Sequence, residues 1–177
     1  MKKYELTAEF IEKWGKKLFR IKALISFGSV EAGELGGYVE KEDNLAQNGN
    51  AWVCDDAEVY GNARVFGSAR VCGDARVYGN ARVCGNAWVC GNADYLLIGR
   101  IGSRFSFTTF FKNKDKGITV SCGCFLGTIA EFRAKVTDTH GNNKHAKMYN
   151  LAADMAELQI LGEEHFDKLN TNKSEPF

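Results

Sequence analysis

Residues 50–91 read NAWVCD, DAEVYG, NARVFG, SARVCG, DARVYG, NARVCG and NAWVCG, a repeat with a period of six. Alanine returns at every sixth position from 51 to 87, and valine returns at every sixth position from 53 to 89. Side chains two residues apart on a strand point the same way, so each Ala and Val pair faces one interior. Gly-Asn and Gly-Asp pairs turn the chain between these short strands. The pattern predicts a parallel β-helix with coils about 4.8 Å apart.

Three hexads complete one coil of such a helix, so side chains 18 positions apart should form columns. One column holds Trp52, Arg70 and Trp88, in which a guanidinium would lie between two indoles. A second column places Arg64 over Arg82, an arrangement that favours an anion between them. Two interpretations stay open for these five residues. The columns either stabilise neighbouring coils or bind a partner protein or a small anionic ligand.

Two further columns carry charge and sulfur. The charged column alternates in sign and consists of Glu58, Arg76 and Asp94. The sulfur column consists of Cys54, Cys72 and Cys90. These cysteines occupy a repeat position otherwise filled by Tyr or Phe, so we interpret them as small hydrophobic residues in a reducing compartment. Their spacing lacks the short pairs of a zinc site, and the sequence predicts no metal and no cofactor.

The segment before the repeat, residues 1–43, is predicted to cap the first coil. Leu18–Ile25 alternates as a strand does, and residues 14–17 could turn it back on residues 9–13 as a hairpin. Val39 and Leu45 fall in phase with the later alanines, which predicts that the first coil starts near Val39. The repeat itself is assigned to residues 44–98.

The C-terminal region, residues 99–162, follows other rules. A hairpin is expected over 101–124, and Thr128 with Glu131 forms a capping box that opens a helix through about residue 136. A second helix is expected over 142–161. The helix is expected from apolar residues at three- and four-residue spacing, which are Met148, Leu151, Ala152, Met155, Leu158 and Leu161. Residues 163–177 are predicted to be a polar tail.

Composition restricts the classes of partner. Of 177 residues, 23 are Lys or Arg and 22 are Asp or Glu, a net charge of +1, so bulk charge argues against nucleic acid and anionic membranes as partners. No stretch reaches the roughly 18 apolar residues that a membrane span needs. The sequence predicts a cytoplasmic protein.

The V-[YCF]-G-[NDS]-A-x run resembles the hexapeptide-repeat, left-handed β-helix superfamily, and more closely its GNARVYGNAWV-type members from bacteria, phages and prophages. The flanking segments 18–24, 32–39, 123–131 and 139–141 resemble segments that accompany such repeats. The resemblance implies a left-handed parallel β-helix of about three coils, with an N-terminal cap and a C-terminal β-hairpin plus two α-helices. It also implies a phage or prophage origin, and with it the cytoplasm of a host.

The best-known enzymes of this superfamily are trimeric acyltransferases with a catalytic His on a coil, and here no His lies within 44–97. His140, His145 and the thiols of Cys122 and Cys124 are interpreted as structural. We therefore expect a non-catalytic binding protein that engages a host macromolecule or a small ligand, for example a counter-defence inhibitor or sponge. The alternatives are an acyltransferase that uses acyl-CoA and a structural trimer or virion component. Outward aromatic columns also predict a homo-oligomer, with a trimer favoured.

Overall fold

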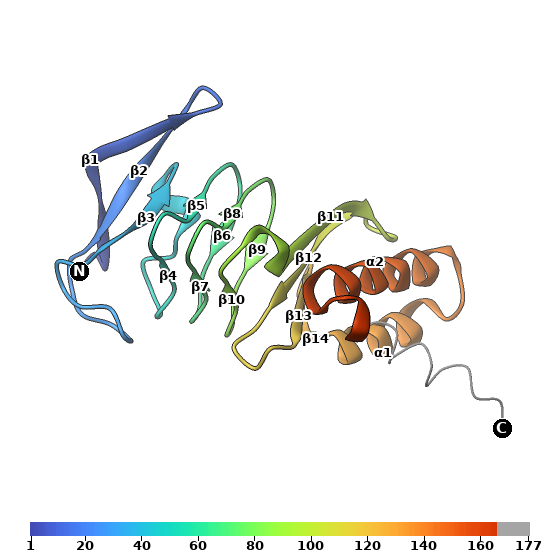
Figure 1. Ribbon diagram of the computed structural model, residues 1–177. Helices are drawn as coiled ribbons and strands as arrows, with labels where there is room; N and C mark the ends of the chain where they lie inside the picture. Colours follow the sequence, from blue (N-terminus) through green and yellow to red (C-terminus); the bar gives the residue numbers. More distant parts are fainter. Residues whose placement is uncertain (166–177) are drawn as a thin grey trace. The chain divides into compact units, whose positions relative to one another are not determined.

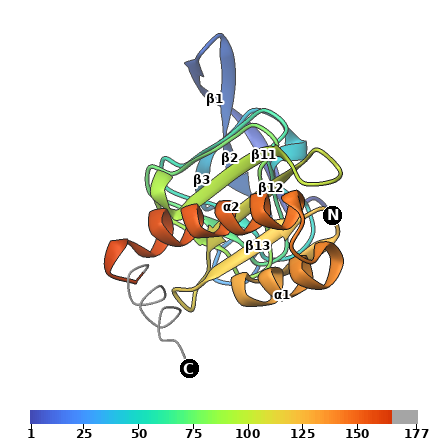
Figure 2. The same ribbon diagram turned by 90° about the vertical axis from the view of Figure 1, so that its right-hand side faces the viewer.

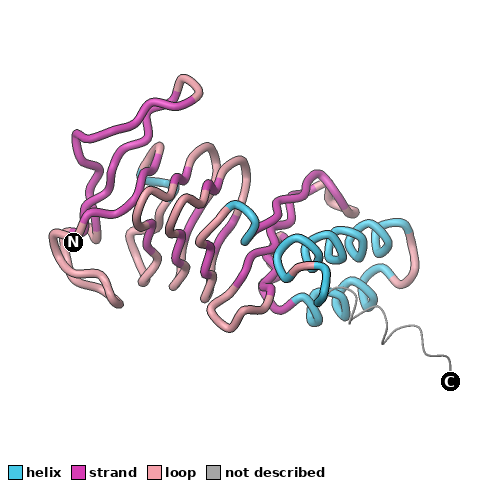
Figure 3. Tube along the Cα trace, viewed as in Figure 1, coloured by secondary structure: helices cyan, strands magenta, loops and turns pink. Residues whose placement is uncertain are grey.

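Short parallel strands carry the repeat in the computed structural model, which describes residues 1–165 (Figure 1). Each strand contains two residues, and turns separate successive strands (Figure 3). The valine of every strand and the alanine two positions before it are at most 1% exposed, which confirms that they share one interior. The strands are β4 (Trp52–Val53), β5 (Glu58–Val59), β6 (Arg64–Val65), β7 (Arg70–Val71), β8 (Arg76–Val77), β9 (Arg82–Val83) and β10 (Trp88–Val89).

Strands 18 positions apart pair in parallel, as the columns require. Arg70 lies between Trp52 and Trp88 in the sheet of β4, β7 and β10. The other two pairs of strands are β5 with β8 and β6 with β9. The described chain is therefore mainly β, with parallel sheets and two longer α-helices. It divides into two units, Met1–Asn92 and Ala93–Phe177.

The predicted register of the first coil is wrong by two residues. Val39 and Leu45 were expected opposite alanines, but Val39 pairs with Val59 and Leu45 bridges to Val65. The cause is local, because Leu45 and Val53 are separated by eight positions where later valines are separated by six. Val39 and Leu45 therefore occupy valine positions of the interior, where both are at most 1% exposed.

The two extra residues fall in the segment that holds the N-terminal strand. Gln47 lies in this segment, and its Oε1 accepts a hydrogen bond from the Lys3 amide at 2.9 Å. Its Nε2 donates to the Tyr4 carbonyl at 3.3 Å. The side chain of Gln47 thus satisfies backbone groups that neighbouring strands satisfy elsewhere in the repeat.

An antiparallel hairpin precedes the repeat, as predicted. It is formed by β1 (Tyr4–Lys13) and β2 (Lys16–Ala23), and β2 pairs in turn with β3 (Leu35–Val39). Strand β3 runs parallel to β5, so the order of this sheet is β1-β2-β3-β5-β8. A 3-10 turn, η1 (Glu42–Asn44), follows β3.

Polar side chains complete the first edge of the repeat. Lys3 is 2% exposed, and its ammonium donates to the Ala51 carbonyl at 2.8 Å and lies 4.8 Å from the centre of the Phe27 ring. Asn44 is fully buried and donates to the Ala63 carbonyl at 2.8 Å. Backbone acceptors at this edge therefore remain paired although regular strand pairing stops there.

The second unit contains a four-stranded antiparallel sheet in chain order, which follows the 3-10 turn η2 (Asn92–Asp94). The predicted hairpin over 101–124 corresponds to its two central strands, and a further strand lies on each side. The strands are β11 (Tyr95–Ile101), β12 (Ser106–Lys112), β13 (Ile118–Cys122) and β14 (Phe125–Thr128).

Two helices cover one face of this sheet (Figure 2). Helix α1 (Ile129–His140) begins with the predicted capping box, in which Thr128 accepts from the Glu131 amide and Glu131 accepts from the Thr128 amide. Helix α2 (Lys144–Leu161) follows, with Asn143 as its N-cap. The described residues include no helix that is both long and apolar enough to cross a membrane.

The helix expected over 142–161 is present, but most of its apolar stripe is not the buried face. Of the expected stripe, Ala152 is buried and Leu161 is partly buried, whereas the larger side chains are 40–63% exposed. The helix instead packs through Ala146, Tyr149, Ala152, Ala153, Ala156 and Ile160. Alanines allow α2 to approach the sheet closely, and their small side chains make this face inconspicuous in the sequence. Most of the predicted polar tail, residues 166–177, lies outside the described residues.

The first prediction tests the interior of the repeat. Val71→Asp should lower the free energy of unfolding by more than about 3 kcal/mol, because it buries a carboxylate and removes a packed side chain. Arg82→Asp changes an exposed side chain and should leave stability within about 1 kcal/mol of the wild type. Urea unfolding followed by circular dichroism measures both. Equal losses in the two variants would contradict this assignment of inside and outside.

The second prediction concerns pH. Burial lowers the pKa of Lys3 from 10.5 to about 8. Between these values the unfolded chain holds a proton that the folded chain has lost, so the unfolding free energy should rise with pH through this window. The unfolding free energy of Lys3→Met should rise less over this pH range than that of the wild type.

The matched control for this measurement is Lys2→Met, whose side chain is 59% exposed and which should keep the pH dependence of the wild type. Burial raises the pKa of Tyr4, which opposes the rise at the alkaline end in all three proteins, so the difference between the curves is the informative quantity. Parallel curves for Lys3→Met and the wild type would refute the prediction.

Candidate functional site

The Trp52–Arg70–Trp88 column has the expected register but is not the expected surface. Trp52 is fully buried, whereas Trp88 is 47% exposed. The rings of Tyr4 and Phe27 meet the Trp52 indole edge-on, with centroids 6.3 and 5.5 Å away. The N-terminal cap thus covers the first member of the column, and Trp52 cannot contact a partner directly.

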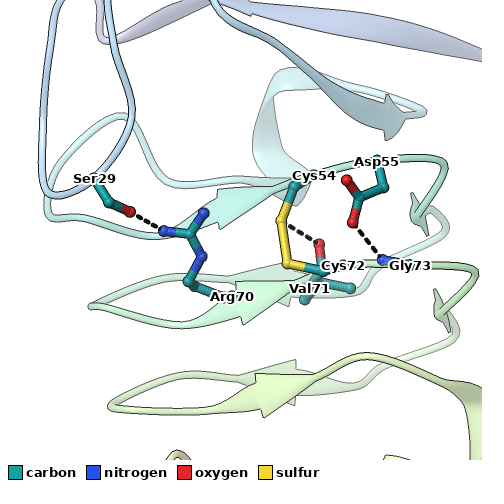
Figure 4. Close-up of a disulfide and its surroundings, with 7 residues drawn as sticks. All are labelled: Ser29, Cys54, Asp55, Arg70, Val71, Cys72 and Gly73. Atoms are coloured by element: carbon teal, nitrogen blue, oxygen red, sulfur yellow. Dashed lines mark hydrogen bonds between the residues drawn. A yellow bond between two sulfur atoms is a disulfide. The ribbon is translucent and has the colours of Figure 1, made fainter.

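Arg70 makes a different contact from the one predicted. Its guanidinium donates to the hydroxyl of Ser29, in the loop between β2 and β3 (Figure 4). Among residues 1–165, it makes no cation–π contact with either indole. Arg70 and Trp88 remain at the surface in whole or in part, and binding by them stays a prediction.

The Arg64 and Arg82 column is present, and both side chains are exposed. The Arg82 guanidinium lies 5.4 Å from the centre of the Phe66 ring. Beside Arg64 is an open cleft of about 250 Å³ that Lys41 and Asp43 also line. The carboxylate of Asp43 offsets one of the two cations that line this cleft, Lys41 and Arg64. The cleft therefore attracts an anion less strongly than the two cations alone would.

The interpretation of all repeat cysteines as simple hydrophobic residues is wrong for one pair. Cys54 and Cys72 form a disulfide, with Cα atoms 4.6 Å apart (Figure 4). Asp55 lies beside it, and its carboxylate accepts from the Gly73 amide at 2.9 Å. The two sulfurs and this carboxylate lie within 4.8 Å of one another, which is close enough for a metal if the cysteines were reduced. Parallel pairing causes this proximity, because it places residues 18 apart side by side.

A second site, which the sequence did not predict, lies in the C-terminal unit. It is a cavity of about 360 Å³ between the β11–β12 loop, the end of β13 and the facing sides of both helices. Aromatic and apolar side chains form part of its lining, and polar groups form the rest. The lining residues are Ser103, Arg104, Ser106, Cys122, Gly123, Phe125, Phe132, Lys135, Val136, Thr139, His140 and Tyr149.

The charge of this cavity is one-sided. Arg104 supplies a guanidinium, Lys135 an ammonium and His140 an imidazole. Hydroxyl donors also line it, and no aspartate or glutamate is present in the lining formed by residues 1–165. Guanidinium, ammonium and hydroxyl groups together bind carboxylates and phosphates, and an apolar wall suits an organic body attached to such an anion.

Tyr149 joins the polar and apolar parts of the cavity. Its ring stacks on His140 with centroids 5.8 Å apart and meets Phe132 edge-on. Burial, followed by the neighbouring Cys122 thiol, raises the pKa of Tyr149 to about 12, and Arg104 acts in the opposite direction. The phenol therefore stays neutral near pH 7 and can donate a hydrogen bond to an anion.

The absence of a side chain at Gly102 leaves room for the hydroxyl of Tyr149. Gly102 has a φ of +72°, and a Cβ there would overlap the Tyr149 hydroxyl. The same turn carries Arg104 to the rim of the cavity. The sequence contains GSR at 102–104, but no short spacing links it to residues of α1 and α2, so the cavity could not be assembled without the fold.

Two of the C-terminal cysteines and histidines predicted to be structural, Cys122 and His140, line the cavity. Cys122 ends β13 and receives a hydrogen bond of 3.2 Å from the Thr108 hydroxyl, whereas Cys124 is exposed in the turn that follows. The two thiols therefore do not share one face of a strand. His140 lines the cavity, and the His145 ring lies 5.8 Å from it.

Comparison with known proteins supports the repeat. The YdcK beta solenoid repeat family matches residues 57–73 and 75–91. The matched segments cover β5 to β10 and define the class of this part of the chain as a β-solenoid repeat. They cover well under half of the sequence and leave out the C-terminal cavity. No curated protein matches the chain.

The two tryptophans provide a direct test of this geometry. Trp52→Ala should lower the free energy of unfolding by about 3–5 kcal/mol, because it leaves a large cavity beneath the cap. Trp88→Ala removes a half-exposed ring from the same column and should have a much smaller effect. Guanidinium unfolding of both variants makes the comparison, and a larger loss at Trp88 would contradict the burial described here.

Proposed function

We propose that this chain is a non-catalytic binding protein whose C-terminal cavity takes a small organic anion. The observation that carries the proposal is the lining of that cavity, which combines Arg104, Lys135 and His140 with aromatic walls and has no carboxylate among its described residues. Ligand cavities in proteins are commonly concave and largely apolar, with a few polar groups that fix orientation. Binding alone needs no bond to be made or broken.

The finer features inferred from the hexapeptide resemblance belong to this proposal. They are a left-handed helix of about three coils, a phage or prophage origin, a homo-oligomeric state and a place in the cytoplasm. The trimer expected from outward aromatic columns loses one of its grounds because Trp52 is buried, and the dimer proposed below is the competing assembly. Parallel pairing at an interval of 18 residues supports a coil of three hexads, and handedness rests on the resemblance. Within this view, the repeat is a scaffold and the C-terminal unit captures the ligand, as a sponge for a host signal would.

The alternative of an acyltransferase is tested at the same cavity, because His140 and Cys122 both line it. Incubation with acetyl-CoA should release no free CoA above the background rate, and His140→Ala should not alter that rate. Release of CoA that disappears in His140→Ala would replace the binding proposal with the enzymatic one.

The binding proposal is tested with phenyl phosphate, which joins an aromatic ring to a dianion. We expect isothermal titration calorimetry to detect binding that weakens with added salt, and benzyl alcohol, which has a ring but no charge, to bind much more weakly. Arg104→Gln and Lys135→Gln should each weaken phenyl phosphate binding about tenfold or more, because each removes a charge-assisted hydrogen bond.

The matched control is Lys114→Gln, which removes the same charge from an exposed position in the β12–β13 turn. It should bind phenyl phosphate as the wild type does. Equal affinities in Arg104→Gln and Lys114→Gln would show that binding reflects general surface charge, and preference for benzyl alcohol would show that the cavity is not an anion site. Either result overturns the proposal.

A further inference from the structure

Helix α2 has a second apolar face that the described residues of its own unit, 93–165, leave exposed. The exposed fractions are 40% for Met148, 63% for Leu151, 56% for Met155 and 45% for Leu158. The inward face of the same helix is complete without them, because alanines, Tyr149 and Ile160 fill it. Four large apolar side chains in one line on a surface helix indicate an interaction surface.

The spacing of these four residues identifies the kind of partner. They follow one another at intervals of three, four and three positions, which is the a and d pattern of a two-helix seam. Such a seam packs against another helix with the same spacing. A second copy of α2 has this spacing by definition, so the face is complementary to itself.

Charges at the two ends of the helix select the direction of pairing. Lys144 and Lys147 are exposed in its first turn, and Glu163 and Glu164 are exposed just after its last residue. In an antiparallel pair that places Leu151 against Met155 of the partner subunit, Lys144 comes opposite position 162, next to Glu163 of the partner subunit. A parallel pair would bring like charges together at both ends. Antiparallel pairing also opposes the two helix dipoles.

The acidic residue that borders the seam does not oppose this arrangement. Asp154 is held at 2.8 Å by the Arg133 guanidinium, which also binds Glu157 at 2.6 Å. The positive charge of Arg133, from α1 of the same chain, therefore offsets carboxylates that would otherwise repel across a two-fold axis.

We propose that α2 pairs antiparallel with α2 of a second copy of this chain, in a two-fold symmetric dimer whose seam is Met148, Leu151, Met155 and Leu158. A two-fold contact uses the same patch on both subunits, and this stripe with its complementary ends is such a patch. The inference is independent of the anion site, since no seam residue lines that cavity.

The experiment measures the mass of the full chain in solution by light scattering after gel filtration. The wild type should have twice the monomer mass of 19.6 kDa at micromolar concentration. Leu151→Glu should be monomeric at that concentration and keep the circular dichroism spectrum and phenyl phosphate titration of the wild type. Leu126→Glu makes the same change at a side chain that is 51% exposed on β14, and it should remain dimeric.

Charge reversal tests the direction of the pair. Lys144→Glu should weaken the antiparallel dimer, and adding Glu163→Lys should restore it, because the double variant exchanges the two ends. In a parallel pair, the single variant would replace one like-charge contact by another and would not change the affinity. A monomeric wild type, a threefold mass, a dimer that survives Leu151→Glu, or failure of the second substitution to rescue the first would overturn the proposal.

Discussion

Parallel pairing between strands 18 residues apart is the constraint on which the first unit depends. It stacks alanine on alanine and valine on valine, and the interior has room for little else. The same pairing also decides which outward side chains meet, because it places residues 18 positions apart next to each other whatever their chemistry. Tyr60 stacks on Tyr78 at 5.3 Å, Arg76 meets the buried Glu58 at 3.7 Å, and Cys54 meets Cys72.

The first edge of the repeat shows what this constraint requires where the period ends. Glu58 is 4% exposed and forms ion pairs with Lys13 of the hairpin and with Arg76 of the neighbouring strand β8. Lys3, Asn44 and Gln47 bond to backbone groups of this region with side chains in place of a preceding strand. Irregular sequence is therefore concentrated at the edge, because each unpaired group needs an individual partner there.

The sequence alone predicted the parts of the fold that repeat or that rest on local signals. The interior alanines and valines, the columns, the N-terminal hairpin and the capping box at Thr128 are confirmed. Errors arose where tertiary contacts decide. Trp52 occupies an outward position of its hexad, but the cap lies over it. Helix α2 has two apolar faces, and the one with larger side chains is the exposed one. The sequence does not predict the cavity, because its lining runs from Ser103 to Tyr149 across three strands and two helices, without a short motif.

The uniform offset between β4 and β10 has a consequence for how such a chain can change over time. Each 18-residue unit presents the same backbone groups to the unit before it and the unit after it. In-frame loss or duplication of a unit beyond the coil that contacts the cap would therefore keep the backbone pairing of every remaining junction. The stack would shorten or lengthen by about 4.8 Å at each event. Gain or loss of repeat units during evolution can thus change the length of this scaffold in fixed steps. The residues at its two ends can change independently of that length.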